Sequence, residues 1–371
     1  MTLHVRGTAL PDGQDIECWI DGDRLSFAPL PGAVTVIDGG FLLPGLADAH
    51  SHPGRGGLGA PLDEAKLEAD ARAHADAGVA LVRVAGSPDR PLPGGLQGLP
   101  GPRGRPDLPR ILDAGVPLGV PGQFPAAGGR IVTAGELPGA AVDHCRAAGG
   151  GWCKIYADWV VDEATLAEPV LTPAAALAEA VRRVHAIGGR VAVHATHASA
   201  CRAVVEAGAD SLEHGLWLDP GLLPRMAAQN TALVPTITAW TRQLDAIMAE
   251  PEPVRSWFLD GLHRLPWLAG QAHSAGVTVL AGTDSEPHGR IADEIRGLAG
   301  GLSPDAALGA GSWTARAFFG LPATLADGGP ADIVAYPADP RQDLTVLDHP
   351  SQVILRGSLR GPAPPGPGHP A

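Results

Sequence analysis

The sequence predicts an α/β protein in which a (β/α)8 TIM barrel carries a small β-sandwich domain built from both chain ends. First, strand-like and helix-like stretches alternate through the middle of the chain, which is typical of parallel strands in βαβ units. Second, eight strand candidates occur there, the number that closes such a barrel in about 250 residues. Third, each chain end carries only short β-like pieces, too few to bury a core of their own.

The eight strand candidates are short, largely apolar runs. They span residues 45–50, 79–85, 110–114, 152–157, 191–196, 211–214, 232–237 and 278–284. Helix candidates with interleaved apolar and charged positions lie between several of them, at residues 62–77, 173–187, 198–207 and 253–275. One of these begins at Thr172-Pro173 and ends at Gly188-Gly189, which are common start and stop residues. The Pro- and Gly-rich residues 86–109 are expected to form a long loop.

The two chain ends are expected to pair with each other. The N-terminal pieces are residues 3–7, 16–20, 25–27 and 34–38, and the C-terminal pieces are 332–336 and 352–356. We expect residues 1–44 plus 320–360 to form one small β-sandwich beside a barrel at residues 45–319. Residues 361–371 are mostly proline and glycine, and are expected to be a disordered tail.

Composition excludes several classes of function. The net charge is −13, and no basic stripe could hold a phosphate backbone, so we expect no nucleic-acid partner. No apolar run approaches the roughly 18 residues that span a bilayer, and the N-terminus lacks the pattern of a secretory signal. The four cysteines are scattered, which favours reduced thiols in a cytoplasmic protein. The oligomeric state stays open, and a homo-oligomer is compatible with the sequence.

Lys154 is unusual because only two of the 27 lysines and arginines are lysines, and this one lies in an apolar strand candidate. Lysine can become a neutral amine and act as a nucleophile, whereas the guanidinium of arginine stays positively charged and acts only as a hydrogen-bond donor. The alternative is an amine that reaches solvent past its apolar stem.

Histidines stand at the ends of three strand candidates. His50 and His52 are two residues apart, so a strand places both imidazoles on one face, where they can bind one divalent metal. His194 and His214 end successive strands, and active sites in this barrel lie at that end. Two surface residues, or two structural histidines, are the alternatives.

Asp284 ends the eighth strand candidate, where it could be a metal ligand or the N-cap of a following helix. Counting back in twos gives the residues expected to share the barrel interior with Lys154, His194, His214 and Asp284, namely residues 152, 192, 212 and 282. By the same parity, Glu213 should face the helix layer or lie at the strand end.

Together these residues resemble the metal-dependent amidohydrolase superfamily. The shared motifs are Leu43-Pro-Gly-Leu-x-Asp-x-His-x-His52, the lysine of the fourth strand, the two strand-end histidines, Gly282-Thr-Asp284 and Gly329-Pro-Ala-Asp-Ile-Val-Ala335. More narrowly, the chain is similar to the imidazolonepropionase-like and zinc-dependent Xaa-Pro dipeptidase (prolidase) group. The markers are Val193-His-Ala-Thr-His197, Glu206-Ala-Gly-Ala-Asp-Ser-Leu-Glu-His-Gly215 and Gly282-Thr-Asp-Ser-x-Pro-His-Gly289.

This resemblance implies a binuclear metal site. His50, His52 and Asp284 would hold one ion, and His194 and His214 the other. Lys154 would bridge them as an N-carboxylated lysine, formed from the neutral amine and CO2, with one oxygen for each ion. Zinc is the default expectation, although manganese or cobalt would also suit these ligands.

The leading hypothesis is hydrolysis of an amide or related C–N bond in a small substrate such as a dipeptide or an N-acyl amino acid. The two metals would lower the pKa of a bridging water to give hydroxide, and Asp284 would pass its proton to the leaving nitrogen. His197, Tyr156, His288 and Arg130 are candidate substrate contacts, each of which could equally be a surface or packing residue. Arg130 stands where dipeptidase-like members commonly have histidine after two glycines.

Three alternatives remain. A mononuclear imidazolonepropionase-like cyclic amidohydrolase or deaminase would lack the bridging lysine, so Lys154 argues against it. An esterase or lactonase could use the same site. A non-catalytic scaffold typically loses metal ligands, whereas all six expected positions are filled here.

Overall fold

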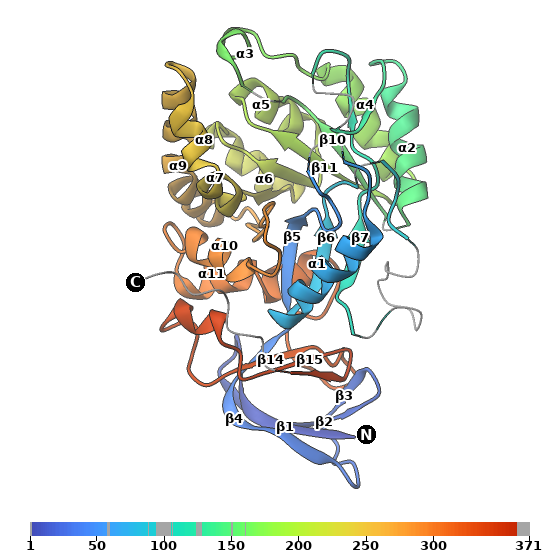
Figure 1. Cartoon of the computed structure of the whole chain (residues 1–371), viewed down its shortest axis with the longest axis vertical. Helices are drawn as coiled ribbons and strands as arrows, with labels where there is room; N and C mark the ends of the chain where they lie inside the picture. Colours follow the sequence, from blue (N-terminus) through green and yellow to red (C-terminus); the bar gives the residue numbers. More distant parts are fainter. Residues whose placement is uncertain are drawn as a thin grey trace.

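A computed structural model describes residues 2–57, 60–87, 89–93, 105, 107–123, 128–149, 151–159 and 161–361. Most of the predicted loop 86–109 and all of the predicted tail except Gly361 lie outside the described residues. The fold has two parts: a larger α/β part, with strands inside and helices around them, and a small sheet below it (Figure 1). Within the described residues, no helix is long and apolar enough to cross a membrane.

The strands of the larger part are parallel and form two sheets. The three-stranded sheet has the order β5 (Leu46–Ser51), β6 (Val79–Val84), β7 (Arg110–Asp113). The six-stranded sheet has the order β13 (Ala232–Val234), β12 (Ser211–His214), β11 (Arg190–Ala195), β10 (Trp152–Tyr156), β8 (Leu118–Gly119), β9 (Arg130–Ile131). Seven of the eight predicted strands therefore form, with ends shifted by a few residues.

The eighth predicted strand is reduced to a single bridge between Val279 and Leu233 of β13. Its neighbourhood still links the two sheets, because Leu280 N donates to Leu233 O and Ala49 N of β5 donates to Ala281 O, at 3.0 and 2.8 Å. In the described part of the chain the strand ladder is not continuous. The α/β class is confirmed, and closure into an eight-stranded barrel stays a prediction.

The predicted strand 232–237 ends three residues early. Pro235 has no N–H with which to continue the ladder, and Thr236 adopts a left-handed φ of 52°. Helix α7 (Ile237–Arg242) begins directly afterwards. The prediction was wrong here because an apolar run does not distinguish a strand from the first turn of a buried helix.

All four predicted helices form. The helix at residues 198–207 has the expected bounds, and the other three are one or two residues shorter at each end. The helices before β13 are α1 (Glu64–Asp76), α2 (Leu137–Ala148), α3 (Glu163–Ala167), α4 (Ala174–His185), α5 (Ala198–Ala207) and α6 (Leu223–Gln229). Those after α7 are α8 (Leu244–Ala249), α9 (Val254–Ser274), α10 (Ile291–Leu298), α11 (Pro304–Ala310) and α12 (Trp313–Phe318). In α4, for example, Leu177, Ala180, Val181 and Val184 are buried, which is one face of a helix.

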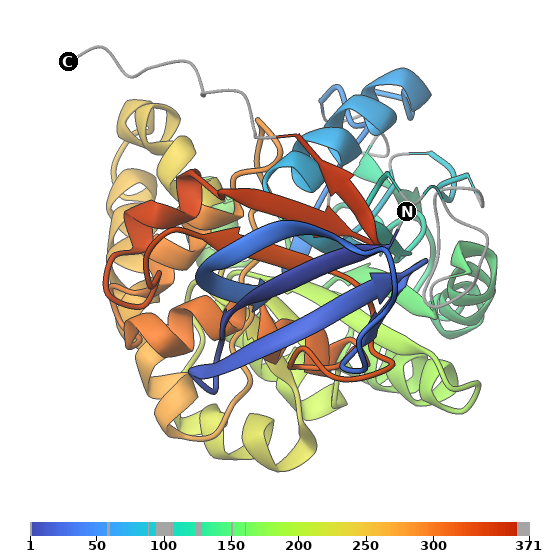
Figure 2. The same ribbon diagram turned by 90° about the horizontal axis from the view of Figure 1, so that it is seen from below.

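Both chain ends contribute to the small sheet, as expected. Its order is β16 (Ser358–Arg360), β15 (Gln352–Leu355), β14 (Ile333–Tyr336), β4 (Val34–Pro44), β1 (Leu3–Ala9), β2 (Gln14–Asp21), β3 (Arg24–Ser26). The pairing is continuous and forms one seven-stranded sheet, and its arrangement as a sandwich stays a prediction. Figure 2 shows the N-terminal and C-terminal strands beside each other. In β4, Gly39 and Gly40 have φ of 102° and 76°, where the register with β1 shifts.

Asp332 joins the two parts of the molecule. Its carboxylate is fully buried and accepts hydrogen bonds from Arg110 Nη1 at 2.5 Å and from the backbone N of Arg356 at 2.9 Å. Arg316 Nη1 lies 3.5 Å away. Arg110 belongs to β7, and Arg316 to α12, so one carboxylate ties the small sheet to two elements of the larger part.

Candidate metal centre

A β-bulge in β5 turns His50 into the site. Asp48 pairs with Val82 and Ser51 with Val84, so β5 advances by three residues while β6 advances by two. Such an extra residue re-aims a side chain. Asp48 stabilises the turn, because its carboxylate accepts from His50 N at 3.1 Å and from Thr283 Oγ1 at 2.6 Å.

Three of the histidines have a partner that fixes the proton on Nδ1. His52 Nδ1 donates to the carbonyl of Gly86 at 2.8 Å, and His50 Nδ1 donates to Glu213 Oε2 at 2.6 Å. Thr236 Oγ1 donates to its neighbouring carbonyl, so it accepts from His214 Nδ1 at 2.7 Å. Each Nε2 is therefore left with a lone pair, which is the usual arrangement of histidines that ligate a metal.

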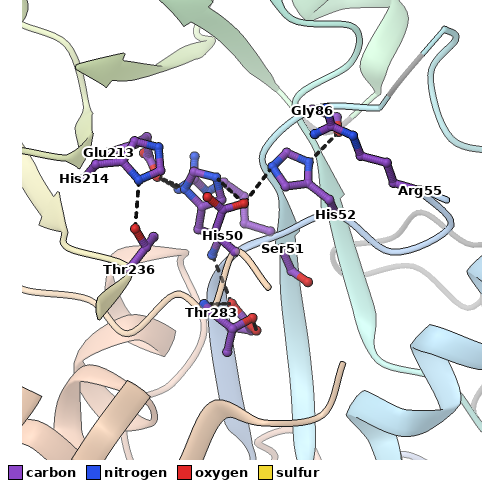
Figure 3. Close-up of polar contacts among 12 residues, drawn as sticks. His50, Ser51, His52, Arg55, Gly86, Glu213, His214, Thr236 and Thr283 are labelled. Carbon is purple, nitrogen blue, oxygen red and sulfur yellow. Dashed lines mark hydrogen bonds and ion pairs between the residues drawn. The ribbon is translucent and has the colours of Figure 1, made fainter. Parts of the chain in front are cut away.

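The lone pairs of His50 and His52 lie beside Asp284, and Figure 3 shows the two histidines next to each other. His52 Nε2 lies 3.2 Å and His50 Nε2 3.6 Å from Asp284 Oδ1. Ligand atoms of His50, His214 and Asp284 all lie within 4.8 Å of one another. His194 is next in the row, with its ring centroid 4.5 Å from that of His214.

Asp284 reaches this position through an unusual backbone. It has a left-handed φ of 43°, and its N donates to His50 O at 2.8 Å. Gly282 allows the close approach, because a Cβ there would lie 2.6 Å from His50 Cβ and 2.8 Å from His50 N. The predicted alternative, an N-cap, does not apply: α10 is preceded by Arg290, which makes no side-chain cap.

Lys154 lies at the same site and is 1% exposed. Its Nζ has no hydrogen-bond partner among the described residues. Burial lowers the pKa of this amine to about 8, with Arg83 and Arg55 opposing its charge and Glu213 and Asp284 favouring it. A substantial fraction of the amine is therefore neutral near pH 8, in contrast to an exposed lysine.

Burial also keeps the imidazoles neutral. It lowers the pKa of His50 to about 4 and that of His194 to about 4, and holds the pKa of His214 well below its ordinary value. Neutral imidazole is the form that binds a metal. At neutral pH these histidines therefore present lone pairs.

Glu213 lies near the end of β12 and is bonded to His50, which agrees with the expected strand-end placement and not with its alternative, the helix layer. Its Oε2 accepts from Arg83 Nη2 at 2.6 Å as well as from His50, and Arg83 is fully buried. Leu212 packs instead in the core shared with the helices. His214 still enters the site because its left-handed φ of 69° breaks the alternation of the strand. Burial alone would raise the pKa of Glu213, but Arg83 and His50 outweigh it and hold the pKa well below its usual range.

One cavity of about 220 Å³ collects all six predicted metal ligands. Of the predicted substrate contacts only Tyr156 lines it. Sequence reasoning missed its other walls, which are Arg55, Trp159, Val161, Thr196, Ala239, Trp240, Gln243 and Phe258. Most of these residues follow strands or belong to α7 and α9, where no local pattern marks them.

The other three predicted contacts lie elsewhere. His197 Nδ1 is held by Asp158 Oδ2 at 2.8 Å, beside the cavity wall residue Thr196. His288 is buried with its Nδ1 3.2 Å from Ser51 Oγ. Arg130 is exposed, with its Nη1 3.2 Å from His144 Nε2. None of the three lines the cavity.

Comparison with known proteins gives a consistent picture. A profile described as the amidohydrolase family matches residues 41–360. An uncharacterized protein of Mycobacterium tuberculosis (strain ATCC 25618 / H37Rv) is 39% identical over 372 residues, covering 97% of this chain and 96% of that protein. An uncharacterized protein of Mycobacterium bovis (strain ATCC BAA-935 / AF2122/97) matches equally.

Solved structures share the fold. A Xaa-Pro dipeptidase with bound methionine in the active site has a TM-score of 0.79 at 22% identity, covering 97% of this chain and 100% of that one. A prolidase complexed with N-methylphosphonate-L-proline has a TM-score of 0.80 at 21% identity, covering 97% and 99%. The ochratoxinase of A. niger has a TM-score of 0.78 at 18% identity, covering 96% and 95%. At these identities the likeness concerns the fold.

Proposed function

The chain belongs to the amidohydrolase family, hydrolases that act on C–N bonds, and from this premise we propose that it is a binuclear metal-dependent enzyme. Its substrate would be a small amide, such as a dipeptide or an N-acyl amino acid. The observation that carries the proposal is the convergence on one cavity of six side chains from distant parts of the chain: His50, His52, Lys154, His194, His214 and Asp284.

The residues present fit divalent metals. Imidazole and carboxylate are the ligands that zinc prefers, and three of the imidazoles have their second nitrogen occupied by a protein partner. His50, His52 and Asp284 would hold one ion, and His194 and His214 the other. Two bound ions would supply an activated water at neutral pH and polarise the scissile carbonyl.

Lys154 supports the proposal because an unpartnered buried amine between metal ligands is costly unless it is converted or neutralised. We propose that the neutral amine adds CO2 to become a carbamate and releases a proton. The carbamate carries one negative charge and two oxygens, so it could bridge two ions. Arginine at this position could not react in this way.

Asp284 is placed to handle protons. Its carboxylate lines the cavity and lies beside the Nε2 atoms of His50 and His52. We assign it the role of accepting the proton of the attacking water and returning it to the leaving nitrogen. The C–N bond breaks, a C–O bond forms, and the amine leaves neutral.

One observation favours a second candidate, a mononuclear cyclic amidohydrolase or deaminase. Within the described part of the chain, only the group of His50, His214 and Asp284 brings ligand atoms within 4.8 Å of one another, which suits a single ion. The metal content of the purified protein distinguishes the two, because the binuclear enzyme holds two ions per chain.

The test combines metal analysis with a substrate screen. Metal-loaded protein is assayed on dipeptides including Xaa-Pro, N-acyl amino acids and lactones. Asp284→Asn should abolish hydrolysis, whereas Asp143→Asn, at an exposed position on α2, should not. Hydrolysis of lactones alone would establish C–O cleavage and overturn the amide proposal, and unchanged hydrolysis by Asp284→Asn would overturn its assigned role.

A further inference from the structure

We infer that Arg55 binds a carboxylate of the substrate, and that the substrate is an amide with a short carboxylate-bearing half and an aromatic or bulky apolar half. This inference rests on the proposed function, since it names the substrate class of the same site. It comes from the arrangement of charge and aromatic rings along the row of histidines.

The loop that carries Arg55 is built to hold it. The backbone of Arg55 pairs with Leu62, and the N of Gly54 donates to Asp70 Oδ2 of α1 at 2.8 Å. Gly54 has a φ of 81°, and a Cβ there would lie 2.8 Å from both Leu62 Cδ1 and Leu67 Cβ. The loop is therefore packed tightly against α1, and Arg55 projects from a fixed backbone.

The charge of Arg55 has no acidic partner among the described residues, and its Nε donates only to the carbonyl of Gly57, at 3.4 Å. No carboxylate lies within 4.0 Å of its guanidinium among the described residues, although most arginines in that part of the chain pair with one. Arg55 nevertheless lines the cavity, as the only charged donor there besides Lys154. A guanidinium facing a cavity without a counter-charge is suited to a planar carboxylate.

Arg55 lies at one end of the row of histidines. Figure 3 shows its side chain beside His52 and Gly86, away from His214. The ring of His50 comes next, with its centroid 5.3 Å from that of His52 and 5.2 Å from that of His214. A substrate held at Arg55 therefore extends along the proposed metal ligands.

The other end of the row is aromatic. The ring of Trp240 lies 5.7 Å from that of His214 and 5.9 Å from that of Phe258, and Trp159 lies 5.2 Å from His194. Val161 and Ala239 complete this wall. Such a surface buries an aromatic or bulky apolar group.

Arg130, the carboxylate partner expected from the sequence, does not fill this role. It is exposed, contacts His144 and does not line the cavity. The sequence indicated an arginine for the carboxylate, and the structure moves that assignment from the loop before α2 to the loop after β5.

The test measures binding separately from hydrolysis. Hippurate (N-benzoylglycine) and its neutral analogue N-benzoylglycinamide have the same shape and differ in one charge. Their binding to the metal-loaded parent protein is measured by rapid mixing, before turnover, as quenching of tryptophan fluorescence, since Trp159 and Trp240 line the cavity. Arg55→Gln should weaken hippurate binding by about 10- to 100-fold, the usual value of a hydrogen-bonded charge, and leave the amide unchanged. Arg55→Lys should recover part of the loss.

A matched control is Arg146→Gln, at an exposed position on α2, which should bind hippurate as the parent does. Equal loss of both ligands in Arg55→Gln would show a structural effect and overturn the inference. The inference would also be overturned if Arg130→Gln lost hippurate binding while Arg55→Gln bound hippurate as the parent does. If the parent enzyme binds hippurate through Arg55 but cleaves no amide, the proposed function fails and the carboxylate site stands.

Discussion

Replacing Asp332 by asparagine should destabilise the protein strongly without touching the candidate site. The carboxylate is fully buried and lies within 3.5 Å of two guanidinium groups, those of Arg110 and Arg316, which are 6% and 1% exposed. Asparagine keeps an acceptor for the N of Arg356 but removes the only charge that compensates the two arginines in this cluster. Breaking a buried ion pair from one side costs about 3 to 5 kcal/mol. Since the backbone bond survives, we expect about 3 kcal/mol.

The assay is urea unfolding at pH 7, followed by tryptophan fluorescence. The control variant is Glu179→Gln, which removes a partly exposed partner of Arg182 and should leave the unfolding curve of the parent unchanged. The sign of the pH dependence gives a second check. Burial would raise the pKa of Asp332, but Arg110 and Arg316 outweigh it and lower the pKa, so its stabilisation is present above about pH 4 and is lost as pH falls through the folded pKa. The difference between parent and variant should shrink in acid. A difference below about 1 kcal/mol at pH 7 would show that the cluster does not hold the two parts together.

Three further predictions concern the candidate metal centre. Lys154→Arg keeps the charge but cannot form a carbamate, so metal analysis should find one ion per chain or none; two ions would refute the bridging role. Gly282→Ala places a Cβ 2.6 Å from His50 Cβ. It should lower the metal content and also the unfolding free energy, the latter by about 1 to 3 kcal/mol. The control Gly135→Ala has open space around it and should keep its full metal content. Glu213→Gln removes the negative charge beside His50 Nδ1 and should weaken metal binding about 10- to 100-fold in a chelator competition; unchanged affinity would mean that the charge of Glu213 does not contribute to metal binding.

The sequence identified the proposed ligands because each stands within or directly after a strand candidate, where the order of residues along the chain sets their position in space. Lys154 and His194 follow simple alternation: Trp152 and Ala192, two residues earlier, share one buried cluster. Glu213 and His214 do not, because the left-handed φ of His214 is a tertiary feature that no period of two can reveal.

The residues that tune the site were harder to predict for a related reason. Arg83 lies in the middle of an apolar strand, and no sequence pattern relates it to the site. Its role follows from the folded structure, in which its Nη2 donates to Glu213 at 2.6 Å. Arg55 follows a recognisable motif, but its entry into the cavity depends on packing against α1. Residues that are distant in sequence and come into contact only in the folded protein leave no local sequence pattern.

The fold was predictable to the extent that local patterns determine it. Alternating strands and helices follow from periodicity, and the pairing of the two ends follows from their small size. The continuous pairing of the small sheet depends on β4, an 11-residue strand that passes Gly39 and Gly40 without breaking. The sequence predicted a short strand that ends at residue 38, directly before these two glycines.

The left-handed conformations of His214, Thr236 and Asp284 have a consequence for how this protein can change over time. Each places a side chain with a Cβ where glycine would be preferred, at a cost of about 1 to 3 kcal/mol. All three either line the candidate site or hold a residue that does. The conformations that shape the site therefore lower the stability of the fold. In a lineage that needed the scaffold and no longer needed the reaction, these positions would be among the first to drift, towards glycine or asparagine, and the loss of activity would accompany a gain in stability.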